Sequence, residues 1–153
     1  MRVDAALLVL RVAGLGLLLL HGIGKMKGLL AGTSQFPASV ANLGFPLPTV
    51  FAWAAALTEV VGGTLIAIGL FTRVAAAFAA FTMAVAAFGR HKAHLWVLGQ
   101  AGLYSVSPEQ ARAWGSPELA LAYLLIFVAL ALAGAGRYAV DARRGGGAGR
   151  KRR

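Results

Sequence analysis

Residues 5–30 read AALLVLRVAGLGLLLLHGIGKMKGLL and decide the fold of this chain. The stretch is longer than the ~20 predominantly apolar residues that a helix needs to cross the hydrocarbon core of a bilayer. It also exceeds the apolar core of a secretory signal peptide, about 7 to 15 residues, and no small-residue cleavage site follows it. We therefore predict that residues 5–30 form a transmembrane helix, which carries Arg11, His21 and Lys25.

The composition of the whole chain indicates a membrane protein. Of the 153 residues, 59% are hydrophobic and 13% are charged, and the mean hydropathy is +0.74. A soluble domain has about 25% charged residues, so lipid must solvate most of this surface, and soluble enzyme classes are excluded. The chain has no cysteine, which excludes disulfides, thiolate nucleophiles and iron–sulfur ligation. A redox role would need a cofactor or partner from outside the chain.

Three further apolar stretches predict three more membrane-spanning helices, at about residues 49–71, 74–92 and 117–136. Residues 93–116 are then a long outer loop, whose Trp96, Tyr104 and Trp114 suit the headgroup region of a bilayer. The predicted fold is an all-α membrane protein, a bundle of four transmembrane helices formed by residues 1–141. Residues 142–153 are predicted to be a flexible basic tail.

The distribution of positive charge predicts the orientation. With both termini in the cytoplasm, nine Lys and Arg residues lie on the inner side and five on the outer side, which the positive-inside rule favours.

The formal net charge of +10 comes largely from the tail, which offers glycines rather than a basic face with interleaved aromatics. Nucleic-acid binding is therefore not expected. We expect a multi-pass protein of a bacterial or archaeal cytoplasmic membrane, in contact with the lipid bilayer.

Four ionisable residues within the spans are the candidate functional residues. At about 100° per residue, Arg11, His21 and Lys25 project into one sector of the first helix, and Glu59 lies near the middle of the second. One interpretation is that Glu59 pairs with Arg11 or His21 to join two helices, because an unpaired charge in lipid is costly. The other is a polar site that holds a head group or relays a proton.

A metal site is the weaker reading of the histidines. His91 and His94 have the i, i+3 spacing that places both on one helix face, on the same outer side of the membrane as His21. Arg90 and Lys92 stand among them and repel cations. We therefore expect no metal.

Motifs spread along the chain resemble those of the DoxX family of small four-helix membrane proteins. The resemblance covers about residues 8–141 and implies site residues at matched positions. The motifs are Arg11 with His21-Gly22 and Lys25, Leu43-Gly44-Phe45-Pro46, Glu59 with Gly62-Gly63, Gly69-Leu70-Phe71-Thr72-Arg73, Glu118, and Gly134-Ala135-Gly136-Arg137-Tyr138 with Asp141.

The resemblance implies a subunit or accessory of a membrane oxidoreductase, or a protein of quinone and oxidative-stress defence. We expect a quinone-like ligand, with His21 and Glu59 exchanging protons with it and Arg11 and Lys25 binding its anionic form. Arg73, Arg137, Tyr138 and Asp141 form a second group, for which an ion-pair cluster at the cytoplasmic helix ends is an equal explanation. Electrons would come from a partner subunit, so whether this chain is itself an enzyme stays open.

Two other functions fit the same residues. A small proton-coupled exporter, acting as a homo-oligomer, could use one membrane glutamate as a shared site for protons and cations. A non-catalytic structural adaptor could use Glu59 only to join helices. Substrate flux or loss of folding in a Glu59 variant would distinguish these functions.

Overall fold

The computed structural model describes residues 1–145, and within that range the chain forms helices and no strands. The predicted all-α fold is confirmed. Residues 146–153 of the predicted tail lie outside the described part. The elements in chain order are α1 (Arg2–Gly16), η1 (Leu17–Gly22), α2 (Ile23–Leu30), α3 (Phe36–Ala41), α4 (Pro48–Leu57), η2 (Thr58–Gly62), α5 (Gly63–Ile68), α6 (Thr72–Ala84), η3 (Val85–Arg90), α7 (Ala93–Gln100), α8 (Pro108–Trp114), α9 (Glu118–Ala133) and α10 (Val140–Gly145).

Three continuous helices are long and apolar enough to cross a membrane: Arg2–Leu30, Pro48–Ile68 and Thr72–Arg90. Each contains a π-helical turn, named η1, η2 and η3. The fourth predicted span is α9, which has 16 residues. Together with α8, to which it is bent by 43°, α9 meets the same criteria for a span. These features make the chain a multi-pass helical membrane protein.

The second and third spans end where a residue takes a left-handed backbone conformation. The second span ends at Gly69, with φ of 73°, and the third ends before Lys92, with φ of 49°. A residue in this left-handed region cannot continue a right-handed helix. The third helix therefore stops at Arg90, two residues before the predicted boundary, and the predicted outer loop contains α7 and α8.

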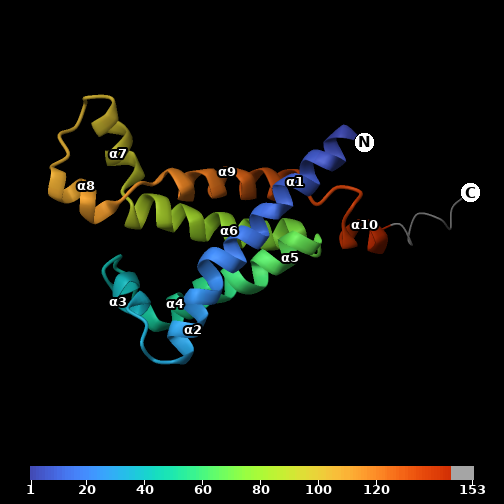
Figure 1. Ribbon diagram of the computed structural model, residues 1–153, viewed down its shortest axis with the longest axis horizontal. Coiled ribbons are helices and arrows are strands. Elements are labelled where there is room, and N and C mark those ends of the chain that lie inside the picture. Colours follow the sequence, from blue (N-terminus) through green and yellow to red (C-terminus); the bar gives the residue numbers. More distant parts are fainter. Residues whose placement is uncertain (146–153) are drawn as a thin grey trace, which may run out of the picture.

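The N-terminus and α10 lie at one end of the molecule, and α3, α7 and α8 lie at the other (Figure 1). We call these the terminal end and the loop end. The first two spans contact each other through glycines, because a Cβ on Gly14 would lie 2.5 Å from the carbonyl oxygen of Gly63. The third and fourth spans pack α6 along α9, with the alanines of α6 against Phe127 and Leu130.

Much of the outer surface is apolar. Leu125 and Leu132 of α9 are 70% and 74% exposed, and Phe78 of α6 is 62% exposed. Exposure of this kind is expected where lipid covers the protein, because lipid tails solvate such side chains at no cost. The buried core is built mainly of small residues, which let the helices approach closely.

Candidate functional site

The acidic residue of the second span pairs with a lysine of the first. The ammonium of Lys25 in α2 donates to Oε1 of Glu59 in η2. Glu59 is completely buried, and the side chain of Lys25 is 31% exposed. The sequence predicted Arg11 or His21 as the partner of Glu59, but the long side chain of Lys25 takes that place.

The second carboxylate oxygen of Glu59 has a different environment. Oε2 is buried and has no hydrogen-bond partner within residues 1–145. The first span approaches Glu59 closely because Gly22 has no side chain: a Cβ there would lie 3.1 Å from the Cβ of Glu59. Glu59 therefore combines one ion-paired oxygen with one unsatisfied oxygen, and an unsatisfied buried acceptor is costly.

His21 lies in η1 and contacts an aromatic residue of the fourth span. Its ring meets Tyr123 of α9 edge-on, with 6.1 Å between ring centroids. Tyr123 in turn stacks on Phe127 at 5.6 Å, and its hydroxyl lies where a side chain on Gly16 would be. Tyr123 was not predicted as a site residue, although a phenol within the apolar run of α9 was a usable signal.

His21, Lys25, Glu59 and Tyr123 line one cavity of about 620 Å³. Drug-sized ligands occupy pockets of about 300 to 1,000 Å³. The cavity lies between the first two spans and the last two, toward the loop end, where the two pairs of helices diverge (Figure 1). Most of its wall is apolar and rich in aromatic rings, which come from α3, α4, α6 and the loop before α4: Phe36, Phe45, Phe51, Phe78 and Phe81.

The rim of this cavity includes Arg90 and His91. Arg90 donates from Nη1 to the carbonyl oxygen of Ala113 at 2.7 Å. His91 donates from Nδ1 to the carbonyl oxygen of Trp114 at 2.6 Å, which requires the tautomer protonated at Nδ1. These two bonds fasten α8 to the end of the third span.

The histidines do not gather around a common point. His94 stacks on Phe88, with centroids 6.5 Å apart, while His91 bonds to α8 and His21 contacts α9. No group of three or more His, Cys, Asp or Glu residues within residues 1–145 is arranged to hold a metal ion.

Arg11 lies at the terminal end and is not among the residues that line the cavity. It is 2% exposed, and its Nη2 donates to the carbonyl oxygen of Tyr138 at 2.8 Å. Gly69 makes room for the guanidinium, since a Cβ there would lie 1.8 Å from Nη1. The predicted polar stripe of the first helix is thus divided between the two ends.

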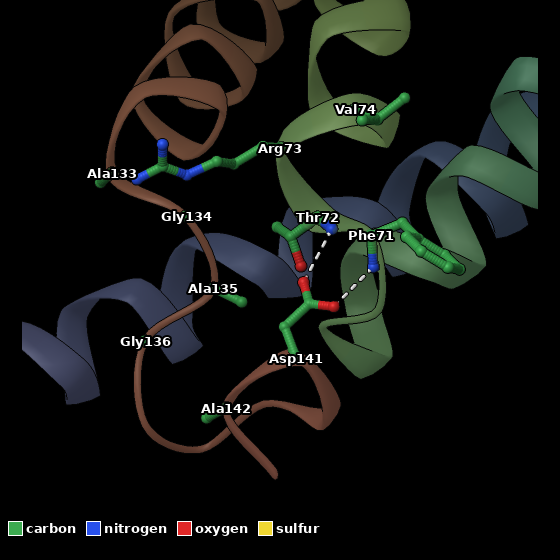
Figure 2. Close-up of a pocket in the computed structure, with 10 residues that line it drawn as sticks. All are labelled: Phe71, Thr72, Arg73, Val74, Ala133, Gly134, Ala135, Gly136, Asp141 and Ala142. Atoms are coloured by element: carbon green, nitrogen blue, oxygen red, sulfur yellow. Dashed lines mark hydrogen bonds between the residues drawn. The ribbon is translucent and has the colours of Figure 1, made fainter. Parts of the chain in front are cut away.

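Asp141 connects the chain after α9 to the start of α6 (Figure 2). Its Oδ1 accepts from the amide of Phe71 at 2.8 Å, and its Oδ2 accepts from the amide of Thr72 at 2.9 Å. Its own amide donates to the carbonyl oxygen of Gly69 at 2.8 Å. Asp141 thereby caps the N-terminus of α6 and supports Phe71, whose φ of 48° is unusual for a non-glycine residue.

The other residues of the second predicted group surround this cap. The backbone amide of Arg137 donates to Oδ1 of Asp4 at 3.0 Å, and Tyr138 is 55% exposed. Arg73 and Asp141 line an open depression of about 420 Å³ (Figure 2). The bonds made here join the N-terminal helix, the second and third spans, and the chain after α9.

Comparisons with known proteins identify the family. The DoxX family profile matches residues 6–92. The inner membrane protein YphA of Escherichia coli (strain K12) is 35% identical over 139 residues, which are 90% of this chain and 89% of that protein. An uncharacterized protein of Haemophilus influenzae is 32% identical over 136 residues, which are 86% of this chain and 85% of that protein. No solved structure matches the chain. This chain belongs to the DoxX family.

Proposed function

We propose that the chain binds a small lipid-soluble molecule of quinone-like type in the cavity between its two pairs of helices. The observation that carries the proposal is Glu59, a completely buried residue of the wall of a 620 Å³ cavity, whose Oε2 has no hydrogen-bond partner among the described residues. Most ligand pockets combine an apolar wall with a few polar groups that orient the ligand. In this cavity Glu59, Lys25 and His21 supply those groups.

The aromatic wall favours a ligand that arrives through the bilayer. Phe78 and Phe81 of α6 line the cavity and are each 62% exposed, and we propose that they lie at an opening of the cavity toward the lipid. An apolar molecule dissolved in lipid could pass beside these rings without crossing water. Aromatic rings also stack favourably on a flat ring such as that of a quinone.

The proposed chemistry is proton exchange and not electron transfer. Glu59 and His21 are of residue types that take up and release protons, and Lys25 pairs with Glu59. The chain has no cysteine to carry electrons, so we propose that a partner subunit of a membrane oxidoreductase supplies them. The proposed role of this chain is in defence against oxidative stress. YphA is named an inner membrane protein, and we propose the bacterial cytoplasmic membrane for this chain also.

Arg11 has no part in the proposed ligand site. It was expected to bind the anionic form of the ligand, but it is bonded to the carbonyl oxygen of Tyr138 at the other end of the bundle. Lys25 and Arg90 are the cations that line the cavity among the described residues, and Lys25 is the one that contacts Glu59.

The test is to purify the protein in mild detergent and identify the small molecules that purify with it by mass spectrometry. We expect a stoichiometric quinone-like molecule in the wild type and its loss in Glu59→Gln. Glu109→Gln is the matched control, because Glu109 is exposed in α8, far along the chain from the cavity residues of the first two spans. No bound molecule in the wild type, together with no saturable binding of an added quinone, would refute the proposal.

A structural adaptor is the second candidate, since the pair of Lys25 and Glu59 joins the first two spans. An adaptor predicts that Glu59→Gln fails to fold and that no small molecule binds the wild type. A proton-coupled exporter predicts proton-dependent substrate flux in vesicles containing the wild type, lost in Glu59→Gln. The binding measurement on the wild type separates the adaptor from the other two functions.

A further inference from the structure

The polar end of the cavity presents an acceptor that lacks a donor. Oε1 of Glu59 accepts from Lys25, and Oε2 has no partner among the described residues. An ion-paired carboxylate is ionised, and an ionised carboxylate can only accept hydrogen bonds. Whatever satisfies Oε2 must therefore carry an O–H or N–H group.

No hydroxyl of the described residues donates to Oε2, and three hydroxyls of the cavity wall are used elsewhere. Three Ser and Thr residues of the wall donate to the carbonyl oxygen four residues earlier in their own helices. Ser39 donates to Gln35 at 3.2 Å, Thr58 to Ala54 at 2.9 Å, and Thr82 to Phe78 at 3.1 Å. The donors of these three helices are thus used within the helices, and Oε2 is left for an occupant of the cavity.

We infer that the cavity selects ligands that present a hydroxyl to Glu59, such as a hydroquinone or another phenol, over ligands that offer only carbonyl or ether oxygens. A carbonyl oxygen placed beside Oε2 would bring two acceptors together, and neither could donate. This inference rests on the proposed function and sharpens it. Of a quinone couple, the site holds the reduced, hydroxyl-bearing member more tightly.

The remaining geometry suits a phenol with an apolar body. The ring or chain beyond the hydroxyl would lie against the aromatic wall, which includes the exposed rings of Phe78 and Phe81. Lys25 is already held between the carboxylate and the ring of Phe36, whose centroid lies 4.7 Å from Nζ. The cation is therefore fixed in place, while Oε2 is buried with no donor among the described residues, so a ligand hydroxyl reaches it only where the side chains around it move aside.

The experiment compares a para-heptylphenol with its methyl ether, which share the heptyl-substituted ring and differ in the hydroxyl donor. Binding to the purified protein in detergent is measured by calorimetry. We expect the phenol to bind roughly tenfold or more tightly than the ether, the advantage of a hydrogen bond to a charged acceptor. Both probes partition into detergent, so the ratio of affinities is compared between variants.

Glu59→Gln supplies the discriminating variant. Its amide oxygen can accept from Lys25, while its NH₂ group donates toward the cavity, so the preference should fall to within about twofold or reverse. Glu109→Gln should keep the wild-type ratio. If Glu59→Gln does not fold, the wild-type ratio tests the inference after each affinity is corrected for the measured partitioning of that probe into detergent.

Each outcome decides between the two proposals. Equal binding of phenol and ether by the wild type, as expected if water satisfies Oε2, would overturn this inference and leave the ligand cavity standing. An unchanged preference in a folded Glu59→Gln would overturn it also. No saturable binding of either probe would overturn the proposed function together with this inference.

Discussion

At the terminal end of the bundle Arg11 and Asp141 bond to backbone groups, whereas at the loop end Glu59 bonds to another side chain and faces a cavity. Arg11 and Asp141 contact segments that lie 69 to 127 residues away in the chain. Bonds to backbone fix how segments meet, and they leave little capacity for a ligand. Ionisable groups in one small membrane protein can therefore serve either packing or binding, depending on which groups they bond to.

The largest expected effect comes from filling the space at Gly69. In Gly69→Ala the new Cβ would lie 2.5 Å from the Cβ and 3.0 Å from the Cα of Ala139, and the residue would keep a φ of 73°. We expect the free energy of unfolding in detergent to fall by roughly 4 kcal/mol, from left-handed strain and overpacking together. Thermal unfolding followed by circular dichroism measures it.

Gly32→Ala is the matched control for this change. Gly32 has a similar φ of 68° but a Cβ there would meet nothing within 4 Å among the described residues. It should lose only the strain, about 1 to 2 kcal/mol. Equal losses in the two variants would show that the terminal end is not tightly packed around Gly69.

The second effect tests the ion pair at the loop end. Lys25→Met leaves the buried Glu59 without its cation, so the free energy of unfolding should fall by about 3 kcal/mol. Adding Glu59→Gln removes the uncompensated charge and should restore most of the loss. Lys27→Met, at an exposed position of the same helix, should change stability by less than about 0.5 kcal/mol. A failure of the double variant to recover would mean that the pair is not the source of the loss.

A smaller effect is expected at the cap of α6. Asp141→Ala removes the acceptors for the amides of Phe71 and Thr72 and should cost about 2 kcal/mol of unfolding free energy. Asp141→Asn keeps one acceptor and should cost roughly half of that. Both variants should retain the ligand as the wild type does, measured by mass spectrometry of the purified protein. Loss of ligand without loss of stability would place Asp141 in the binding machinery instead.

Much of the fold follows from the sequence, because apolar length alone predicts the spans. The close approach of the first two helices could also be predicted, from glycines such as Gly14 and Gly63 on facing sides. Helix ends were predicted less well. The third span stops at Arg90 because Lys92 takes a left-handed conformation. A lysine does not predict that conformation, whereas a glycine or asparagine at position 92 would have.

The candidate site was predicted only in part, for a geometric reason. A shared sector of a helix does not mean a shared site, because Arg11 and Lys25 are separated by about 21 Å of rise. They therefore share a sector of the helix and still belong to opposite ends of the bundle. The contact of His21 with Tyr123 and the cap made by Asp141 depend on how distant segments meet, which local patterns do not encode.

The smallest effect concerns a second unsatisfied oxygen, the hydroxyl of Thr72 at the terminal end. Thr72 is completely buried, and its Oγ1 has no partner among residues 1–145, while its amide is held by Asp141. Thr72→Val keeps the shape and the amide bond and removes only the hydroxyl. We expect unfolding free energy to stay the same or rise by up to about 1 kcal/mol. A fall of more than about 1 kcal/mol in the unfolding free energy, measured by thermal unfolding, would mean that this hydroxyl makes a hydrogen bond. Glu59 would then be the residue whose unsatisfied oxygen distinguishes the loop end from the terminal end.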